Sequence, residues 1–430
     1  MRILFVTPYP PSRIRVRGYG FLTQLQREHD VTVVTQCFSE QELADAEVLQ
    51  HQGHNVLVVR ESKRQAMLRS GLALLSSDPL QVAYTRSMRF AQLVQDLCTQ
   101  RSFDVVHIEH LRGIASMEWV ARTQPLVWDA VDCISLLWKQ TIISGPDLPV
   151  RAMALLEHKR TRRYEARMLS LLRHIVVTSE RDRQALIELY RAQNKDDLRS
   201  DEEVGGDIQV LPNGVNLEYF RPMPQERQRF NLVFSGKMSY HANVAAALYL
   251  YQQIMPLIWQ RRPEATLTIV GNKPPKAIQQ LANDPRVEVT GFVSDMRPYL
   301  GRAEVMLSPM VYSVGIQNKV LEAMAMGTPV VVAAQAASAL AARPGRDLLL
   351  AHSTEEFVQA TLSLLDDAEL HSRLSRYGRT YVEQHHDWQT VTNQLVGIYR
   401  RAIATYAGSS SLTAAGARPG GIEVEQRTFS

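Results

Sequence analysis

The residues from Gly315 to Glu322 include side chains that suit a phosphate and a sugar. Lys319 lies four residues after Gly315 and three before Glu322, so the three share one face of a helix, with Asn318 beside them. A helix that begins next to a glycine offers free backbone N–H groups and a positive dipole end to a diphosphate. The Glu322 carboxylate can accept two ribose hydroxyls. We therefore predict that this helix binds a nucleotide.

A simpler interpretation of the same helix is a surface ion pair between Lys319 and Glu322. We favour nucleotide binding because the segment also has a glycine at its start and Asn318 beside the charges. A strand that follows Pro329 completes a loop, helix, turn and strand unit, which is a common setting for a phosphate site.

Three arginines alternate in the segment Tyr9–Gly20, which links the first predicted strand to a helix beginning near Gly18. Arginine can bind a phosphate through two parallel hydrogen bonds. We predict that Gly18 contacts the nucleotide, as the donor of a transferred group, and that Arg17 contacts the acceptor, the molecule that receives this group. A solvated basic loop is the alternative. The segment contains no GxGxxG motif, which argues against a dehydrogenase.

Carboxylates follow two more of the predicted strands. Asp129 and Asp132 have the spacing i, i+3, which suits them to hold sugar hydroxyls or to receive a proton. We predict that both bind the acceptor and that Asp132 is also catalytic, whereas capping of the next helix is the alternative for Asp129. Glu109 and His110 follow an earlier strand, and from this position we expect Glu109 to bind the acceptor as well.

Short aliphatic runs recur along the chain with helical segments between them, which is the pattern of βαβ units and parallel sheets. Such sheets bind ligands outside the carboxyl ends of their strands. The sequence therefore predicts an α/β fold with two doubly wound domains that face a central cleft. The predicted strands are Ile3–Val6, Val31–Thr35, Asn55–Val59, Val105–Ile108, Leu126–Trp128 and Ile175–Thr178, then Leu232–Phe234, Thr266–Val270, Val287–Thr290, Val305–Ser308, Val330–Ala333 and Leu348–Ala351.

Turn-forming residues separate the two sets of strands, at Leu211-Pro-Asn-Gly-Val215 and Arg221-Pro-Met-Pro224. The end of the chain is rich in Gly, Ser and Ala without periodicity, which is typical of disorder. The predicted units are a domain over 1–224, a second domain over 225–386, a helix over 387–405 and a disordered tail over 406–430.

The composition excludes several classes of protein. A chain of 430 residues with 45% hydrophobic residues is ordinary for a soluble protein of two domains. Three widely spaced cysteines suggest neither a disulfide framework nor a thiolate metal site. A net charge of +4 without a nucleic-acid motif argues against a nucleic-acid partner. No apolar run suits a membrane helix or a signal peptide, so we expect a cytoplasmic protein.

A metal site is not indicated by the sequence. No Asp-x-Asp pair follows a predicted strand, so we expect neither a divalent metal nor a cofactor. The segment His385-His386-Asp387 contains two histidines, but adjacent histidines rarely converge on one ion. We interpret this segment as structural.

The C-terminal motif, together with Leu211–Val215 and Lys237-Met-Ser-Tyr-His-Ala-Asn-Val244, resembles the retaining GT-B fold glycosyltransferases of the glycosyl transferases group 1 family. The resemblance covers most of the first four hundred residues and is strongest to sugar transferases of bacterial exopolysaccharide and cell-surface glycan synthesis. It implies two Rossmann-like domains, the first holding the acceptor and the second the nucleotide sugar. It also implies that the helix beginning near Asp387 returns to the first domain.

The resemblance assigns donor contacts to several residues of the second half. Lys237 matches the basic residue that pairs with the donor diphosphate, and Asn243 falls in the same donor-binding motif. Phe292 or Val293 matches the loop that contacts the nucleotide base, although an aromatic residue after a strand is as often part of the core.

Two departures from the family pattern affect the donor site. The second basic residue of the family is Ala242 here, and we hypothesise that Lys319 substitutes for it. The first of two family glutamates is Val314 here, which leaves the identity of the sugar open and retains only Glu322.

The resemblance implies transfer of a sugar, with retention, from a UDP-type or GDP-type donor to a glycan or lipid-linked acceptor. Lys237, Asp132 and Glu322 are the predicted catalytic residues. A sugar-nucleotide epimerase of the same fold and a non-catalytic nucleotide-sugar-binding protein are the alternatives.

A basic stripe of Arg160, Arg163 and Arg167 lies opposite Met168 and Leu172 on another predicted helix. Such a helix could rest on an anionic membrane at the inner face of the cell membrane. A solvated basic face over core leucines is the alternative.

Overall fold

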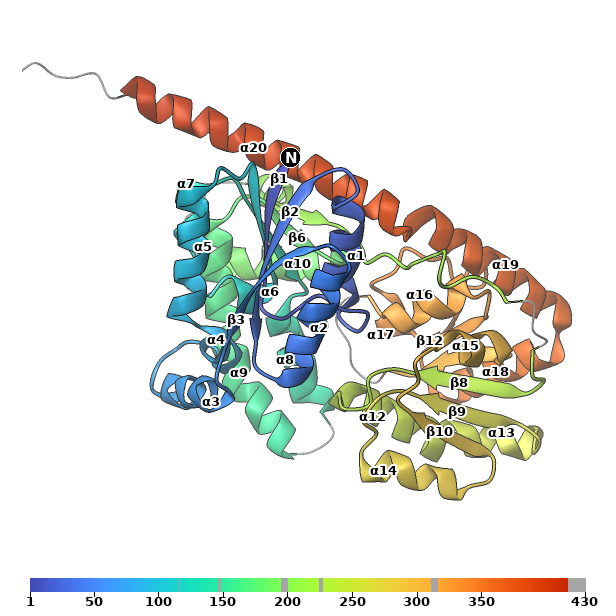
Figure 1. The fold of residues 1–430 in the computed structure, drawn as a ribbon. Coiled ribbons are helices and arrows are strands. Elements are labelled where there is room, and N and C mark those ends of the chain that lie inside the picture. The colour runs from blue at the N-terminus through green and yellow to red at the C-terminus, as the bar shows by residue number, and fades with distance from the viewer. Residues whose placement is uncertain (116, 146–147, 195–199, 224–226, 311–315, 417–430) are drawn as a thin grey trace, which may run out of the picture.

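The computed structural model describes residues 1–115, 117–145, 148–194, 200–223, 227–310 and 316–416. These residues form two lobes, each built on a parallel β-sheet with helices against it (Figure 1). The strand order is β3-β2-β1-β4-β5-β6-β7 in the first lobe and β10-β9-β8-β11-β12-β13 in the second. Both orders reverse beside the first strand of the lobe, which is the doubly wound arrangement that the sequence predicts.

All twelve predicted strands are confirmed, and the described residues add the short strand β7, whose central glutamine hid it from the pattern. The strands of the first lobe are β1 (Arg2–Thr7), β2 (Asp30–Cys37), β3 (Asn55–Arg60), β4 (Val105–Glu109), β5 (Leu126–Val131), β6 (Ile175–Val177) and β7 (Ile208–Val210). Those of the second are β8 (Asn231–Ser235), β9 (Thr266–Val270), β10 (Val287–Gly291), β11 (Val305–Ser308), β12 (Val330–Ala333) and β13 (Leu349–Ala351).

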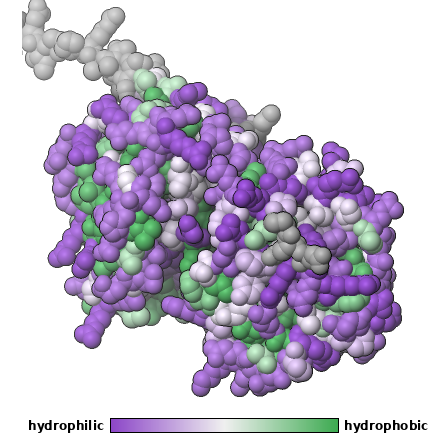
Figure 2. All heavy atoms as spheres, turned by 45° about the vertical axis from the view of Figure 1, so that its right-hand side comes forward, coloured by the Kyte–Doolittle hydropathy of each residue, from purple (hydrophilic) through white to green (hydrophobic). Residues whose placement is uncertain are grey.

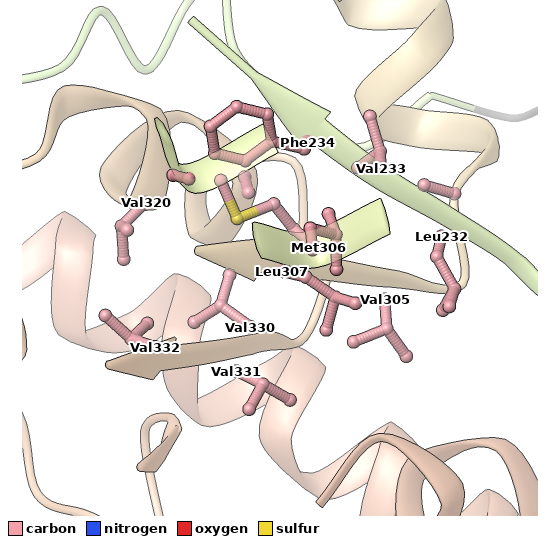
Figure 3. Packing of buried hydrophobic residues seen from close by; sticks show 14 of the residues in the cluster. Leu232, Val233, Phe234, Val305, Met306, Leu307, Val320, Val330, Val331 and Val332 are labelled. Carbon is pink, nitrogen blue, oxygen red and sulfur yellow. The ribbon is translucent and has the colours of Figure 1, made fainter. Parts of the chain in front are cut away.

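The central strands are apolar on both faces because helices cover both faces of each sheet. Every residue of β8, β11 and β12 is buried, and Phe234, Met306 and Val331 pack together in the core of the second lobe (Figure 3). This packing fixes where the strands end, and thus where polar residues after them emerge.

Several helices begin where the sequence supplies a capping side chain. The Ser39, Ser179 and Ser353 hydroxyls accept hydrogen bonds from free backbone N–H groups of the helices that follow them. The first lobe contains α1 (Val16–Leu25), α2 (Glu40–His51), α3 (Lys63–Leu72), the 3₁₀ turn η1 (Ala73–Leu75), α4 (Leu80–Thr85), α5 (Met88–Gln100), α6 (His110–Gly113), α7 (Val120–Thr123), α8 (Ile134–Ser144), α9 (Leu148–Leu171), α10 (Glu180–Gln193) and α11 (Asp201–Asp207). The second contains α12 (His241–Tyr249), η2 (Leu250–Ile254), α13 (Met255–Arg261), α14 (Lys276–Gln279), η3 (Gln280–Asn283), α15 (Arg297–Arg302), α16 (Asn318–Ala325), α17 (Ala334–Ala337), α18 (Thr354–Asp366) and α19 (Ala368–His385).

The last helix, α20 (Trp388–Gly416), crosses from the second lobe back to the first (Figure 1). Its Trp388 ring packs against both Gly20 and Gly214, where an added Cβ would lie 2.1 and 2.5 Å from the ring. Tyr399 and its apolar neighbours on α20 join the core of the first lobe. The glycines therefore leave room for the ring that fixes the return of the chain.

The tail prediction needs correction, since α20 continues to Gly416 rather than ending at residue 405. Residues 406–416 contain no proline, and their alanines and leucine favour continuation of the helix over a break. Residues 417–430 lie outside the described part of the chain. The predicted division at residue 224 also falls outside it and stays a prediction.

No helix in the described part of the chain combines the length and apolar character needed to cross a bilayer. The predicted basic stripe lies on α9, and its contact with a membrane stays a prediction. Arg160 is turned to protein carbonyl groups, and Arg167 lies 3.5 Å from the Glu118 carboxylate. Arg167 is nevertheless 61% exposed, and Arg163 is exposed as well.

Candidate functional site

A tight loop follows β8 at the carboxyl edge of the second sheet. A Cβ on Gly271 would lie 1.8 Å from the Gly236 carbonyl oxygen, and a Cβ on Gly236 would lie 2.8 Å from Asn243 Nδ2. The Asn243 amide donates to the Lys237 carbonyl at 3.0 Å. Two glycines and one asparagine therefore fix this loop, and they leave the Lys237 side chain exposed at the end of the strand.

The start of α16 joins this loop through Lys319. The Lys319 ammonium donates to Asn243 Oδ1 at 2.6 Å and lies 3.3 Å from Met310 Sδ and 4.6 Å from the centre of the Phe234 ring. The side chain is buried, and this burial lowers the pKa of Lys319 to about 7, opposed by the nearby charge of Glu322. The surface ion pair with Glu322 is therefore not formed.

Glu322 lies one turn further along α16. Burial raises the pKa of its carboxyl to about 7, and the charge of Lys319 opposes this rise. Among the described residues, its carboxylate has no hydrogen bond or ion pair. A carboxylate that is both sheltered and unpartnered is suited to accept hydroxyl groups of a ligand.

The helix α16 is stopped where the sequence predicts. Gly327 has a φ of +70°, and the backbone N–H of Thr328 reaches back to the Ala323 carbonyl at 2.9 Å. This is the usual glycine-ended helix terminus. The predicted Gly315 lies outside the described residues, and the helix begins at Asn318.

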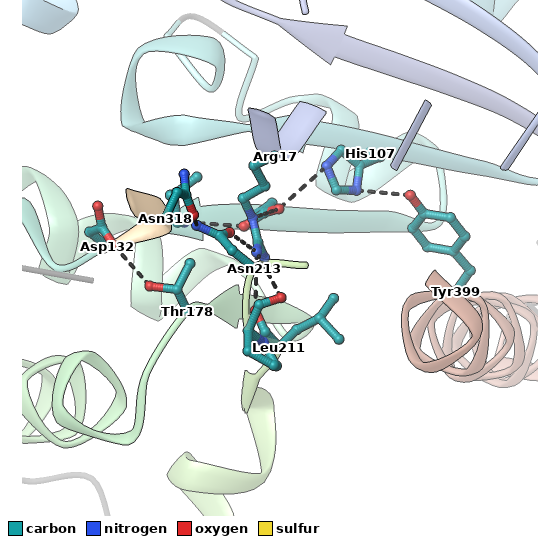
Figure 4. Close-up of polar contacts among 11 residues, drawn as sticks. Arg17, His107, Asp132, Thr178, Leu211, Asn213, Asn318 and Tyr399 are labelled. Carbon is teal, nitrogen blue, oxygen red and sulfur yellow. Dashed lines mark hydrogen bonds and ion pairs between the residues drawn. The ribbon is translucent and has the colours of Figure 1, made fainter. Parts of the chain in front are cut away.

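Asn213, which the sequence analysis did not single out, joins the two lobes. Its Nδ2 donates to Asn318 Oδ1 at 3.0 Å, and its Oδ1 accepts from Arg17 Nη1 at 2.8 Å (Figure 4). Its carbonyl oxygen lies 2.7 Å from Nδ1 of the buried His386. The turn motif around Asn213 was the available signal, but a turn motif does not tell which lobe its side chain contacts.

Arg17 and Asp129, which are predicted to bind the acceptor, bind each other in the structure. Arg17 Nε lies 2.7 Å from Asp129 Oδ2, and both side chains are buried. Behind them, Tyr399 bonds His107 at 2.9 Å, and His107 lies 3.8 Å from the same Asp129 oxygen. Arg17 Nη2 has no partner among the described residues, but the charges of Arg17 and Asp129 neutralise each other inside the lobe. We interpret this ion pair as part of the framework of the lobe rather than as an acceptor site.

Gly18 and Glu109 are brought together beside this ion pair. The Gly18 backbone N–H donates to the Glu109 carboxyl, and a Cβ at residue 18 would lie 2.8 Å from Glu109 Oε2. Burial and the charge of Asp129 raise the pKa of Glu109 to about 7, against the effects of Arg17, Arg15 and the Gly18 N–H. Gly18 is thus needed for close approach of a carboxyl that is protonated at mildly acidic pH.

A cavity of about 410 Å³ lies between the lobes, where the surface is hollowed (Figure 2). Asp132 reaches it, held by a 2.9 Å hydrogen bond from the Thr178 hydroxyl. Burial, followed by the charge of Asp182, raises the pKa of Asp132 to about 7. The other lining residues are Gln81, His110, Arg112, Ile134, Leu137 and Trp138 from the first lobe and Tyr240, His241, Met310 and Gln317 from the second.

Two hydrogen-bond donors on the cavity wall are unused. Trp138 Nε1 and Gln81 Nε2 are buried and have no partner among the described residues. Arg112 donates hydrogen bonds to Gln81 Oε1 at 3.1 Å and to the Tyr9 hydroxyl at 3.2 Å. Buried donors without partners are costly, so this wall suits a ligand rich in oxygen atoms.

Two non-glycine residues beside this cavity have left-handed backbone conformations, namely His110 with a φ of 65° and Val131 with a φ of 69°. Such conformations cost roughly 1–3 kcal/mol each and concentrate at functional sites. Val131 precedes Asp132, and His110 lines the cavity itself. The strain therefore helps to aim residues at the space between the lobes.

The remaining predicted contacts differ in exposure. Phe292 projects from the loop after β10 and is 69% exposed, whereas Val293 packs partly against the core. Contact with a nucleotide base stays a prediction for both. Among the described residues, no three His, Cys, Asp or Glu side chains are grouped to hold a metal ion. His386 bonds Tyr381 and Asn213 instead, as the structural interpretation predicts.

The sequence of the second lobe matches the model of the family described as glycosyl transferases group 1 over residues 229–367. Those residues form a glycosyl transferases group 1 domain. The match spans the loop after β8 and all of α16, so Lys237, Asn243, Lys319 and Glu322 belong to this domain.

Curated relatives are similar to parts of the chain. The MMP α-(1→4)-mannosyltransferase of Mycolicibacterium hassiacum is 29% identical over 211 residues, which are 46% of this chain and 50% of that protein. The D-inositol 3-phosphate glycosyltransferase of Mycobacterium marinum is 25% identical over 71% of this chain and 65% of its own length. The alignments thus span about half to two thirds of these relatives.

Solved structures show the fold of more than nine tenths of the chain. The HepE protein of Anabaena in complex with UDP has a TM-score of 0.63 at 15% identity, over 92% of this chain and 99% of that one. Sucrose-phosphate synthase of Thermosynechococcus elongatus has a TM-score of 0.67 at 14% identity, over 94% and 100%. The chain therefore has the GT-B fold, with two Rossmann-like domains.

Proposed function

We propose that this protein is a glycosyltransferase that moves a sugar from a nucleoside diphosphate sugar to an acceptor hydroxyl. The observation that carries the proposal is that the charged cluster around Lys319 adjoins the cavity between the lobes, because Met310 contacts Lys319 and also lines that cavity. The unpartnered Glu322 and the cations Lys237 and Lys319 lie in the glycosyl transferases group 1 domain. Asp132 and the two donors without partners among the described residues line the first-lobe side of that cavity.

The donor is proposed to be of the UDP or GDP type. The Lys237 side chain, the Lys319 ammonium and the start of α16 supply positive charge for its diphosphate. Lys319 suits the place of the missing family cation because its ammonium contacts Asn243, the neighbour of the apolar Ala242. Glu322 would bind the ribose, and the exposed Phe292 or its neighbour Val293 would contact the base.

The acceptor is proposed to occupy the 410 Å³ cavity between the lobes. The Trp138 indole and the Gln81 amide would donate to its oxygen atoms, and Asp132 would hold the reacting hydroxyl. This assignment replaces Arg17 and Asp129, whose charges satisfy each other.

The proposed reaction retains the configuration of the sugar. The bond from the anomeric carbon to the diphosphate oxygen breaks, and its electron pair stays with the diphosphate. A new bond forms from the acceptor oxygen on the same face, and the acceptor proton passes to the departing phosphate oxygen. Lys237, Lys319 and the start of α16 would stabilise the developing charge without a metal ion or cofactor.

The biological setting remains a proposal. Relatives named as mannosyl and inositol-phosphate glycosyltransferases and a neighbour solved with UDP-glucose fit a hexosyl donor and a glycan acceptor. We propose a role in exopolysaccharide or cell-surface glycan synthesis from the cytoplasmic side of the membrane, with a glycan or lipid-linked acceptor.

The test is incubation of the purified chain with a panel of UDP-sugars and GDP-sugars and with oligosaccharide and polyprenyl-phosphosugar acceptors. Mass spectrometry would follow the nucleoside diphosphate and the extended acceptor together. We expect both products from one donor, with loss of both in Glu322→Gln and no change in the exposed control Glu264→Gln. An epimerised donor without extended acceptor, or binding without turnover, would contradict the proposal.

A further inference from the structure

An apolar surface protrudes from the first lobe at α3 and η1. Its large side chains point to solvent, and Leu75 at the end of η1 is 89% exposed. Large aliphatic residues in such numbers rarely stay in water on a soluble protein unless they contact something. The exposed members are Met67, Leu68, Leu72, Leu74 and Leu75.

The first half of α9 and the end of α8 extend this surface away from η1. One side of α9 is buried through Ala154, Glu157 and Thr161, which turns the opposite side outward. That outer side is apolar in its first half, where Leu148 is 80% exposed. The exposed aliphatic residues here are Ile143, Leu148, Met153, Leu155 and Leu156.

Hydrogen bonds join α9 to η1 and to the start of α4. The Arg160 guanidinium on α9 donates to the Ala73 and Leu74 carbonyl oxygens of η1 at 2.6 and 3.0 Å. The Glu157 carboxylate accepts from the Leu80 backbone N–H at 3.1 Å. In Figure 1, α3 accordingly lies beside α9 at the outer end of the lobe. We call these ten aliphatic residues and the helices that carry them the α3–α9 surface.

The charge around the α3–α9 surface is of one sign. Residues 63–75 contain no acidic residue, and residues 148–163 contain only Glu157, which is buried. Acidic groups nearby are engaged within the lobe, such as Glu61 with Arg69 and Asp78 with Arg86. The exposed cations are Lys63, Arg64, Arg151, Lys159, Arg162 and Arg163.

We propose that the α3–α9 surface docks on an anionic lipid bilayer. Aliphatic side chains can enter the headgroup region while the cations around them meet lipid phosphates. A second copy of the chain is a poorer occupant, because a symmetric contact would bring two cationic surfaces together. The bilayer alone matches both the apolar and the charged character.

The location of the surface also relates it to the cleft. The helix α8 carries Leu137 and Trp138 on the cavity wall and Ile143 near its exposed end. A protein docked in this way would hold the cavity close to the bilayer. Docking itself does not depend on the proposed transfer reaction, whereas the use of a lipid-linked acceptor would.

The test is co-sedimentation of the full chain with vesicles of phosphatidylglycerol and phosphatidylcholine, compared with phosphatidylcholine alone. We expect binding to the anionic vesicles at low salt. It should weaken at least about tenfold both in Leu72→Ser/Leu75→Ser and in Lys63→Ser/Arg64→Ser. The matched controls Val48→Ser and Arg373→Ser change exposed residues elsewhere and should bind like the wild type.

Thermal unfolding checks that all variants fold, and nucleotide binding monitors the distant donor site independently. Failure of the wild type to bind anionic vesicles, or equal binding by the surface variants, would overturn the proposal. So would a lipid-free dimer that the leucine variants abolish in sedimentation analysis, since the α3–α9 surface would then be a contact between copies of the chain.

Discussion

The Lys319 ammonium lies 2.6 Å from Asn243 Oδ1, and the other end of the Asn243 amide holds the Lys237 carbonyl at 3.0 Å. One asparagine therefore sets the distance between the start of α16 and the loop after β8. These two segments supply the charge proposed for the donor diphosphate. The contact also places the Lys319 ammonium beside the neighbour of Ala242, the position at which the family has its second cation.

We predict that Lys319→Ala weakens binding of the preferred nucleoside diphosphate at least about tenfold, because a charge-assisted contact contributes roughly 1.5–3 kcal/mol. Isothermal titration calorimetry measures this loss. The exposed Lys276→Ala on α14 is the matched control and should bind normally. Unchanged affinity in Lys319→Ala, with affinity lost in Lys237→Ala, would refute the substitution of one cation for another.

Gly271→Ala should destabilise the protein by roughly 1–3 kcal/mol, because the new methyl group would lie 1.8 Å from a backbone oxygen of the donor loop. Urea unfolding with ligand-free protein measures the change. Gly71→Ala on α3 has open space around it and should be neutral or slightly stabilising. An equal free energy of unfolding in the two variants would show that the loop shifts to accommodate the methyl group at little cost.

Asp129→Asn should lower the free energy of unfolding by about 3–5 kcal/mol, because it leaves the Arg17 charge buried without its partner. Denaturant unfolding is the readout, with the exposed Asp96→Asn as the control. A variant of wild-type stability in which only the KM for the acceptor is raised would instead support the acceptor role predicted for Asp129.

The pH dependence of turnover tests Asp132. Burial and Asp182 raise its pKa to about 7, so the carboxyl is largely protonated below that pH and becomes a carboxylate above it. A reaction that needs the carboxylate should therefore speed up as the pH rises through about 7. Asp132→Asn should be slower and should lose this rise, whereas Glu109→Gln should keep it. Identical pH profiles in the wild type and Asp132→Asn would contradict the assignment.

Much of the fold could be predicted from local patterns. Runs such as Val305–Ser308 and Val330–Ala333 are buried strands because helices cover both faces of a parallel sheet, and so their apolar character is visible in sequence. The end of α16 at Gly327 was equally predictable because it depends on backbone conformation within a few residues. The extension of α20 was missed because the composition of residues 406–416 resembles disorder.

The fate of individual polar side chains could not be predicted in the same way. Arg17 and Asp129 are separated by 112 positions, and nothing in either neighbourhood shows that they neutralise each other. The Asn213 and Asn318 contact likewise spans 105 positions and two lobes. The spacing of Lys319 and Glu322 suggested a local pair, but burial and the distant Asn243 determine where the ammonium lies.

The central claim is that the second lobe binds a nucleoside diphosphate through Glu322 and Lys237. Calorimetry of UDP, GDP and ADP with the wild-type chain, with Glu322→Ala and with Lys237→Ala tests it most directly. We predict that one of the three nucleotides binds tightly and that both variants lose this binding while remaining folded. Absence of binding by all three nucleotides, or equal binding in the variants, would contradict a donor site at α16 and with it the proposed transfer of a sugar.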